Sequence, residues 1–279
     1  MNILSFVKRH PVLSYYLMVF AISWGGILFV VGPSEIQRII DINLDMNNPF
    51  FMSVVLLTLS GPIAAGILTT IFVYGKNGLH NIVSKMFRWK VASKWYATAI
   101  LTPLLSVFGT LFALSLFSPT FIPGIFTIAD KVSLVSLAVI VGLIGAFCEE
   151  TGWTGFAIPQ IRERYSIFAT GLLVGILWGV WHFLSNLFGA SISAGTLPLT
   201  LFMPVILFSF LPPFRVLMVW VYDNTKSLLL AMIMHSSLII FWLIATPTGI
   251  SGANLVIWYI AWAVVLWIIA GIVVLKGKK

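Results

Sequence analysis

Two adjacent glutamates, Glu149 and Glu150, lie at the end of an uninterrupted apolar run from Val132 to Phe147. On membrane-insertion scales, an ionisable group at the centre of such a run costs about 2.5–3.5 kcal/mol. A chain carries that cost where the group is paired, solvated in a cavity or used in chemistry. The other acidic residues lie in polar connections: Glu35, Asp41, Asp45, Asp130, Glu163 and Asp223.

Two of the four histidines, His182 and His235, also lie inside apolar segments. Burial of a carboxylate in an apolar pocket favours its neutral form and makes it a candidate general base near neutral pH. Histidines that face the carboxylate can orient a water, donate to a developing oxyanion or bind a metal. Adjacent helical residues point about 100° apart, so one glutamate can face the site while the other makes a structural bond. A hydrolase that uses water directly is the economical interpretation.

Two other kinds of hydrolytic site lack support. The chain has neither a Gly-x-Ser-x-Gly elbow nor a His-Glu-x-x-His helix motif, so neither a serine esterase nor a zincin is indicated. A zinc site held by Glu149, His182 and His235, with an open fourth position, is an alternative. The single cysteine, Cys148, excludes an intrachain disulfide and a multi-cysteine metal site.

Composition indicates a polytopic membrane protein. Of the 279 residues, 60% are hydrophobic and 9% are charged, and the mean hydropathy is +1.06. A soluble domain carries about 25% charged residues. The net charge of +8 therefore indicates topology and contact with anionic lipid headgroups, and no nucleic-acid partner is expected.

Eight apolar segments predict an all-α bundle of about eight transmembrane helices, in a single integral membrane domain over residues 1–279. Each segment approaches the ~20 residues that a helix needs to cross a bilayer. Helices are expected because every backbone group must be satisfied within the membrane. The segments are about 12–31, 50–74, 95–116, 132–157, 167–188, 199–221, 227–245 and 253–275.

Basic residues predict the orientation. All Lys and Arg except Arg38 and Lys131 fall on one side of the predicted bundle, and the positive-inside rule then places both termini in the cytoplasm. This assignment counts Arg215 as a residue of the cytoplasmic side, where it and Asp223 are interpreted as a structural ion pair or a lipid contact. The basic, aromatic segment 75–94 fits an interfacial helix on the inner leaflet.

Helix rise brings the candidate residues to similar depths. Glu149 lies ~15 Å from the cytoplasmic end of its span, His182 lies ~22 Å along the next span, and His235 lies ~12 Å along the seventh. All three can reach one zone in the inner half of the membrane. The spacing therefore predicts that they form one intramembrane site.

Three motifs carry a resemblance to a known family. They are Glu149-Glu150-Thr151-Gly152-Trp153-Thr154-Gly155-Phe156, then Trp178-Gly179-Val180-Trp181-His182, then His235 in a late helix. In this order they resemble the CPBP family of intramembrane proteases, and within it the type II CAAX endopeptidases. The resemblance extends from about Gly61 to Ser237 and predicts a protease-like core over about 61–245.

The resemblance implies a metal-independent, glutamate-dependent endopeptidase without a cofactor. Glu149 would activate water and Glu150 would support the site. His182 would hold the water or the substrate carbonyl, and His235 would stabilise the oxyanion. The implied substrate is a membrane-associated peptide or protein, in the best-known members a prenylated CAAX tail cut after the modified cysteine. The expected location is the plasma membrane of a prokaryote.

Two positions depart from the family pattern. Thr154 stands where an arginine is usual, which removes a positive partner for the carboxylates, and Ile239 stands where an Asn or Asp is usual, which removes an oxyanion donor. Asn186, on the same helix face as His182, is a predicted substitute, and Ser236 or Ser237 are other candidate donors. Trp153 and Trp178 are expected to pack around the site and contact the substrate.

Two other functions are open from the sequence. A non-catalytic family member could act in bacteriocin immunity or as a membrane scaffold. A proton-coupled transporter could use the same carboxylate and histidines as a relay, although no matching pair of broken helices supports it.

Overall fold

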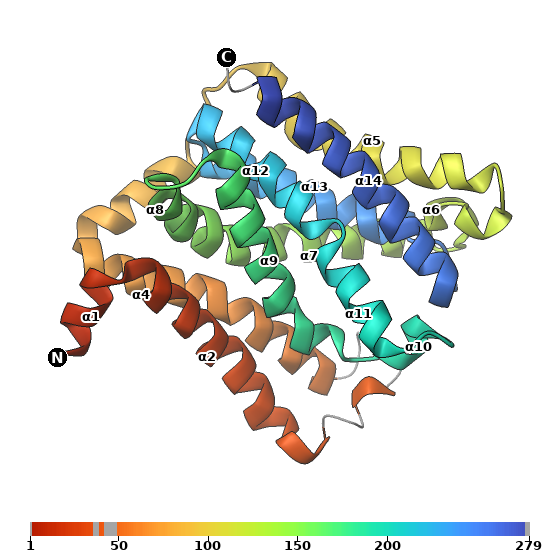
Figure 1. Ribbon diagram of the computed structural model, residues 1–279, viewed down its shortest axis with the longest axis horizontal. Coiled ribbons are helices and arrows are strands. Elements are labelled where there is room, and N and C mark those ends of the chain that lie inside the picture. Colours follow the sequence, from red (N-terminus) through yellow and green to blue (C-terminus); the bar gives the residue numbers. More distant parts are fainter. Residues whose placement is uncertain (1, 36–38, 42–48, 277–279) are drawn as a thin grey trace.

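The computed structural model describes residues 2–35, 39–41 and 49–276, and within these ranges the regular elements are all helical (Figure 1). Eight helical segments of the described chain are long and apolar enough to cross a membrane, which confirms the predicted all-α membrane bundle. Their bounds are Pro11–Val31, Phe50–Met86, Ser93–Ser115, Lys131–Arg162, Ile167–Asn186, Leu199–Thr225, Leu228–Ala245 and Gly252–Lys276. The predictions for Arg38, Asp45, Lys278 and Lys279 lie outside the described residues, and the orientation of the bundle stays a prediction.

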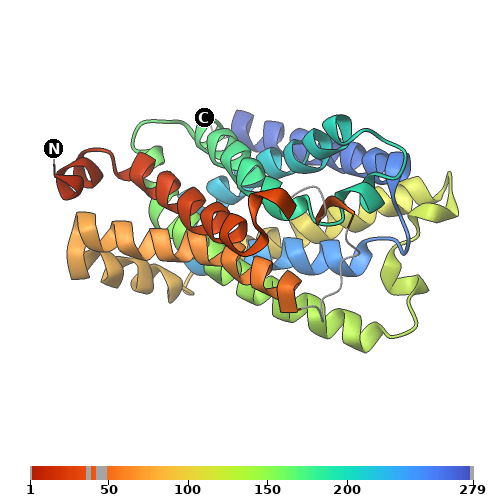
Figure 2. The same ribbon diagram turned by 90° about the horizontal axis from the view of Figure 1, so that it is seen from below.

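The helices around the centre come from distant parts of the chain. In Figure 1, α9 lies between α2 and α4 on one side and α11 and α12 on the other, and Figure 2 shows α2 lying along α4. α7 packs against both α4 and α13, and α9 packs against α12. The helices are α1 (Ile3–Arg9), α2 (Pro11–Val31), α4 (Pro49–Met86), α5 (Ser93–Ser115), α6 (Gly124–Thr127), α7 (Lys131–Gly152), α8 (Ile158–Arg162), α9 (Ile167–Asn186), α10 (Ala190–Ala194), α11 (Leu199–Phe208), α12 (Leu211–Thr225), α13 (Leu228–Ala245) and α14 (Gly252–Lys276).

The three helices that carry the candidate residues each begin at a capping side chain. Asp130 accepts a hydrogen bond from the Ser133 amide at the start of α7. Ser166 and Ser227 cap α9 and α13 in the same way. An N-cap side chain satisfies one of the backbone amides that a helix start leaves without a partner. These polar residues therefore determine where each helix begins.

Small residues let these helices approach closely, as small-residue spacing does in membrane bundles. A Cβ atom added at Gly171 of α9 would lie 2.4 Å from Val216 Cα of α12, and one at Gly179 would lie 2.6 Å from the Leu207 carbonyl oxygen of α11. At Gly142 of α7 an added Cβ would meet Ile240 of α13 at 2.8 Å. α9 therefore lies almost backbone to backbone against α12.

Gly171→Ala is expected to destabilise the bundle by about 1–3 kcal/mol, because backbone atoms of α12 cannot yield to the added methyl group. Gly271→Ala in α14 is the matched control, since an added Cβ there meets nothing within 4 Å. Alanine is the better helix former, so the control should be neutral or slightly stabilising. Thermal unfolding of both variants in detergent tests the difference, and equal midpoints would contradict the packing account.

Two spans differ from their predicted form. α4 continues to Met86 instead of ending at residue 74, with a kink at Gly75 (φ 61°, ψ −150°). The predicted interfacial segment 75–94 therefore contains the last turns of α4 and, from Ser93, the start of α5. The sixth span is divided into α11 and α12. Pro212 and Pro213 lack the amide hydrogens that would continue the helix, and they instead begin α12.

Candidate active site

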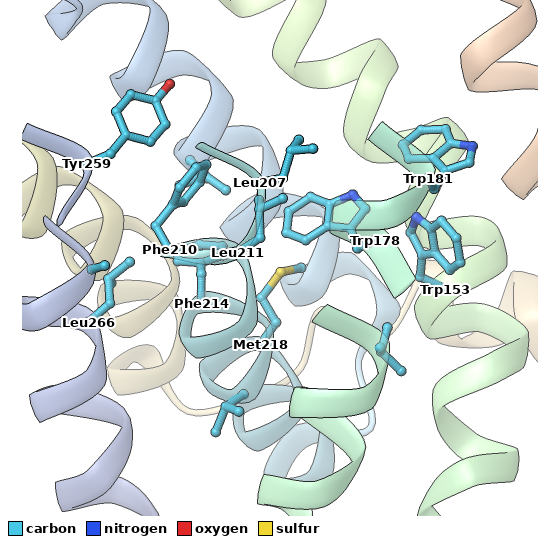
Figure 3. Close-up of a cluster of buried hydrophobic side chains, with 14 of the residues drawn as sticks. Trp153, Trp178, Trp181, Leu207, Phe210, Leu211, Phe214, Met218, Tyr259 and Leu266 are labelled. Atoms are coloured by element: carbon cyan, nitrogen blue, oxygen red, sulfur yellow. The ribbon is translucent and has the colours of Figure 1, made fainter. Parts of the chain in front are cut away.

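Glu149, His182 and His235 line one cavity, as their depths in the sequence predicted. The cavity encloses about 630 Å³, counting the part that opens outward. Figure 3 shows part of its wall, where Trp178 lies beside Leu207 and Leu211. The remaining lining residues are mostly apolar: Asn186, Ile206, Phe210, Leu238, Ile239, Trp242 and Tyr259.

Glu149 presents one carboxylate oxygen to the cavity and anchors the other. Its Oε2 accepts hydrogen bonds from Trp178 Nε1 at 2.6 Å and from Trp153 Nε1 at 3.3 Å. Its Oε1 has no hydrogen-bond partner among the described residues, and no described cation forms an ion pair with it. Only 3% of the side chain is exposed. A buried carboxylate without a counter-ion is costly, so this arrangement is typical of a group kept for chemistry or binding.

Glu150 is used differently, because it is fully buried and does not line the cavity. Its two oxygens lie 2.8 and 3.0 Å from Nη1 of Arg215. His235 Nδ1 lies 2.7 Å from Oε1, and the Thr154 hydroxyl donates to Oε2. Because Arg215 lies on α12 and His235 on α13, Glu150 acts as a fixed charge that joins these two helices to α7.

Arg215 is a site residue that sequence reasoning placed wrongly. It is fully buried, and its guanidinium carbon lies 4.0 Å above the Trp178 ring. It does not pair with Asp223, which instead binds Arg162 at 2.9 Å and Lys226 at 2.6 Å. The available signal was its position inside the predicted span 199–221, where an ionisable residue indicates a functional or paired group.

Arg215 also supplies the positive charge that is lost where Thr154 replaces the usual arginine. The family pattern predicts an arginine on the same helix as the glutamates, and here the positive charge comes from α12 instead. Thr154 remains a partner of Glu150 through its hydroxyl. Because an arginine can hold both oxygens of a carboxylate, the substitution keeps the charge balance of Glu150.

His235 is oriented by Glu150. Its Nδ1 is engaged with the carboxylate, so Nε2 is the ring nitrogen that has no partner among the described residues. Because a carboxylate accepts hydrogen bonds, Nδ1 carries a hydrogen in both protonation states of the ring. The neutral ring then presents a lone pair at Nε2, and the protonated ring presents an N–H there. The first form can hold a water, and the second can stabilise an oxyanion.

His182 lies on α9 and is half-buried. Its ring lies 4.6 Å from that of Trp181 and 5.7 Å from that of Trp178, and its nitrogens make no hydrogen bond to the described residues. Asn186 donates from Nδ2 to the His182 carbonyl oxygen at 2.9 Å. The predicted role of Asn186 as an oxyanion donor depends on its amide hydrogens. This bond uses one of the two, which leaves one to donate to an oxyanion.

Trp153 does not lie where a substrate contact requires it. The side chain is fully buried and is absent from the cavity wall. It packs against Tyr15, Tyr16 and Trp181, and Figure 3 shows it beside Trp181. Trp153 begins a wide π-helical turn, Trp153–Ala157, a distortion that is frequent at functional sites. Its geometry is that of a residue that positions Glu149.

Within the described part of the chain, no three His, Cys, Asp or Glu side chains are grouped as a metal site. The zinc alternative with Glu149, His182 and His235 as ligands is therefore not supported by their arrangement. The expectation that the protein works without a cofactor stays a prediction.

Comparisons with known proteins agree with the motifs. Residues 131–241, which contain Glu149, Glu150, His182, Arg215 and His235, match the family described as "Type II CAAX prenyl endopeptidase Rce1-like". The chain is also 34% identical over 103 residues to a protein of Methanococcus maripaludis named "CAAX prenyl protease 2". That alignment covers 33% of this chain and spans about a third, 35%, of the relative's length. Through the helices that surround the cavity, residues 131–241 of this chain are similar to the type II CAAX prenyl endopeptidases.

Proposed function

We propose that this protein is an intramembrane endopeptidase in which Glu149 activates the attacking water. The observation that carries the proposal is the division of roles between the two glutamates. Glu149 has a free oxygen in a cavity shared with His182 and His235, whereas Glu150 is committed to Arg215 and His235. A hydrolase needs a positioned base and a donor near one reacting carbonyl, and these residues supply both.

The proposed reaction uses only side chains on the cavity wall. Glu149 takes a proton from a water molecule while the oxygen attacks the scissile carbonyl carbon. A donor on His235 or His182 stabilises the negative oxygen of the tetrahedral intermediate. When the C–N bond breaks, Glu149 returns the proton to the leaving amine, which restores the starting carboxylate.

We further propose that the substrate is a membrane-associated peptide that carries a prenyl group near its C-terminus. The cavity wall is mostly apolar, which suits a chain buried in the bilayer, and the archaeal relative is named as a CAAX prenyl protease. The multi-pass fold agrees with a substrate that reaches the site from the membrane. The plasma membrane of a prokaryote is the proposed location.

A quenched farnesylated CAAX peptide, incubated with protein purified in detergent, tests this function. We expect one cleavage, after the modified cysteine, identified from the product masses. The same peptide without the farnesyl group should be cut more slowly, and a chelator should have no effect. If farnesylation makes no difference to the rate, the prenyl assignment is wrong, and if the chelator stops cleavage, the metal-independent mechanism is wrong.

The two tryptophan donors predict a graded effect on that activity. Trp178→Phe should lower kcat more than Trp153→Phe, because Trp178 Nε1 makes the shorter bond to Glu149 Oε2 and lines the cavity. Loss of a hydrogen bond to a charged group corresponds to about 1.5–3 kcal/mol, or roughly tenfold to a hundredfold for Trp178. Initial rates at saturating peptide measure both, and a larger loss in Trp153→Phe would contradict the geometry.

A non-catalytic membrane scaffold is the second candidate, and Ile239 favours it. Ile239 lies on the cavity wall where the family pattern has an amide or carboxyl group, so the site has one donor fewer. If the Glu149→Ala variant fully complements the cellular phenotype of a deletion mutant, the scaffold function is favoured. Complementation that fails with Glu149→Ala at normal protein levels would favour the protease.

A further inference from the structure

A second cavity lies away from the candidate active site, between the end of α1, the start of α2, α8 and α9. It encloses about 1290 Å³, counting the part that opens outward. None of its lining residues belongs to the wall of the first cavity. They are Lys8, Arg9, His10, Pro11, Val12, Leu13, Tyr16, Gln160, Ile161, Glu163, Arg164, Tyr165, Leu173 and Leu177.

Cations dominate the polar part of this wall. Lys8, Arg9 and Arg164 are exposed, and none of them forms an ion pair within the described part of the chain. Glu163 is the one acidic residue on the wall. The adjacent Arg162 is occupied elsewhere, because it binds Asp223 at 2.9 Å. Three cations against one carboxylate leave the cavity with a net positive charge that no ion pair among the described residues balances.

Leucine side chains form much of the apolar part of the wall. Leu13 and Leu173 are 52% and 41% exposed on α2 and α9, and Leu177 lies one turn further along α9. Tyr16 reaches the same wall, and its buried hydroxyl has no hydrogen-bond partner. The cavity thus combines unbalanced cations, a phenol without a partner and exposed leucines, which is the chemistry of a lipid with an anionic headgroup.

We infer that this cavity binds the phosphate group of an anionic phospholipid, with Lys8, Arg9 and Arg164 around the phosphate and the leucines along the acyl chains. Arginine and lysine are the side chains that bind phosphate in proteins, and arginine does so with two parallel hydrogen bonds. Free phosphate would satisfy the cations alone, whereas only a lipid also covers Leu13 and Leu173. The inference does not depend on the proposed protease activity.

Native mass spectrometry of the detergent-purified protein with added phosphatidylglycerol or phosphatidylcholine tests the site. The variant Lys8→Gln/Arg9→Gln/Arg164→Gln should lose affinity for phosphatidylglycerol by about tenfold or more, since each basic residue near a membrane surface contributes to anionic lipid binding. Its phosphatidylcholine binding and unfolding midpoint should not change. The matched control is Lys76→Gln/Lys90→Gln/Lys94→Gln, which removes the same charge from exposed residues outside the cavity and should change phosphatidylglycerol affinity less than about twofold.

Three results would overturn the inference. An equal loss in both triple variants would mean that lipid is attracted by overall charge and not by this cavity. Displacement of phosphatidylglycerol by millimolar inorganic phosphate would identify free phosphate, and not a lipid, as the ligand. Phosphatidylglycerol binding that is unchanged in the Lys8→Gln/Arg9→Gln/Arg164→Gln variant would contradict the claim that these three cations bind the phosphate.

Discussion

Glu149→Gln is expected to lower kcat by about 10²–10⁴-fold, the range that positioned acid–base groups contribute. Glutamine has nearly the same shape and can still accept the hydrogen bonds from Trp178 and Trp153, so the cavity wall should be kept. It cannot take a proton from water. Because Glu149 has no ion-pair partner among the described residues, removal of its charge should leave the free energy of unfolding unchanged or slightly higher.

The measurement is the initial rate on the farnesylated peptide, together with the thermal unfolding midpoint in the same detergent. Glu163→Gln is a suitable control, because Glu163 is exposed and lies outside the active-site cavity. It should retain wild-type activity. If Glu149→Gln keeps more than about a tenth of wild-type kcat, a positioned base of this strength is not operating there.

Arg215→Met should produce the largest loss of stability, about 3–5 kcal/mol, because it leaves the buried carboxylate of Glu150 without its counter-ion. Both side chains of this ion pair are 0% exposed. The matched control is Arg162→Met, whose partner Asp223 lies at a similar distance but whose pair is about one-fifth exposed. Exposed pairs contribute about 0–1 kcal/mol, so the two variants should differ several-fold in their effect on unfolding.

A double variant separates loss of charge balance from loss of packing. Arg215→Met combined with Glu150→Gln removes both buried charges, and it should recover part of the stability lost in Arg215→Met alone. It should not recover activity, because His235 would lose the carboxylate that orients it. If the loss of stability in the double variant equals the sum of the losses in Arg215→Met and Glu150→Gln, the two residues are not coupled.

The fold was predictable because its main signals are local. Length and hydropathy alone predict each span, and the breaks follow proline and glycine, as at Pro212 and Gly75. Hydropathy alone does not divide the sixth span, because both of its halves are apolar and a hydropathy pattern does not register a missing amide hydrogen. The Pro212-Pro213 pair was the signal for it.

The site was predictable in part. Helix rise placed Glu149, His182 and His235 at similar depths, and the structure brings them to one cavity. Arg215 was missed because positive-inside reasoning assigns every basic residue to an aqueous side, whereas burial with Glu150 is a contact between α12 and α7 that no spacing encodes. Trp153 packs around the site as expected and donates to Glu149, but its absence from the cavity wall and the π-helical turn that begins there are features that no spacing encodes.

The most direct test of the account compares Glu149→Gln with Glu150→Gln, measuring kcat and the unfolding midpoint for each. Both variants should lose activity, because Glu150 orients His235, but only one of them should lose stability. Glu149→Gln should lose activity and keep its midpoint, whereas Glu150→Gln should lower the midpoint, because it leaves Arg215 buried without a counter-ion. Two glutamates with the same pattern, or an active Glu149→Gln, would contradict the claim that one carboxylate performs the chemistry while its neighbour holds the site together.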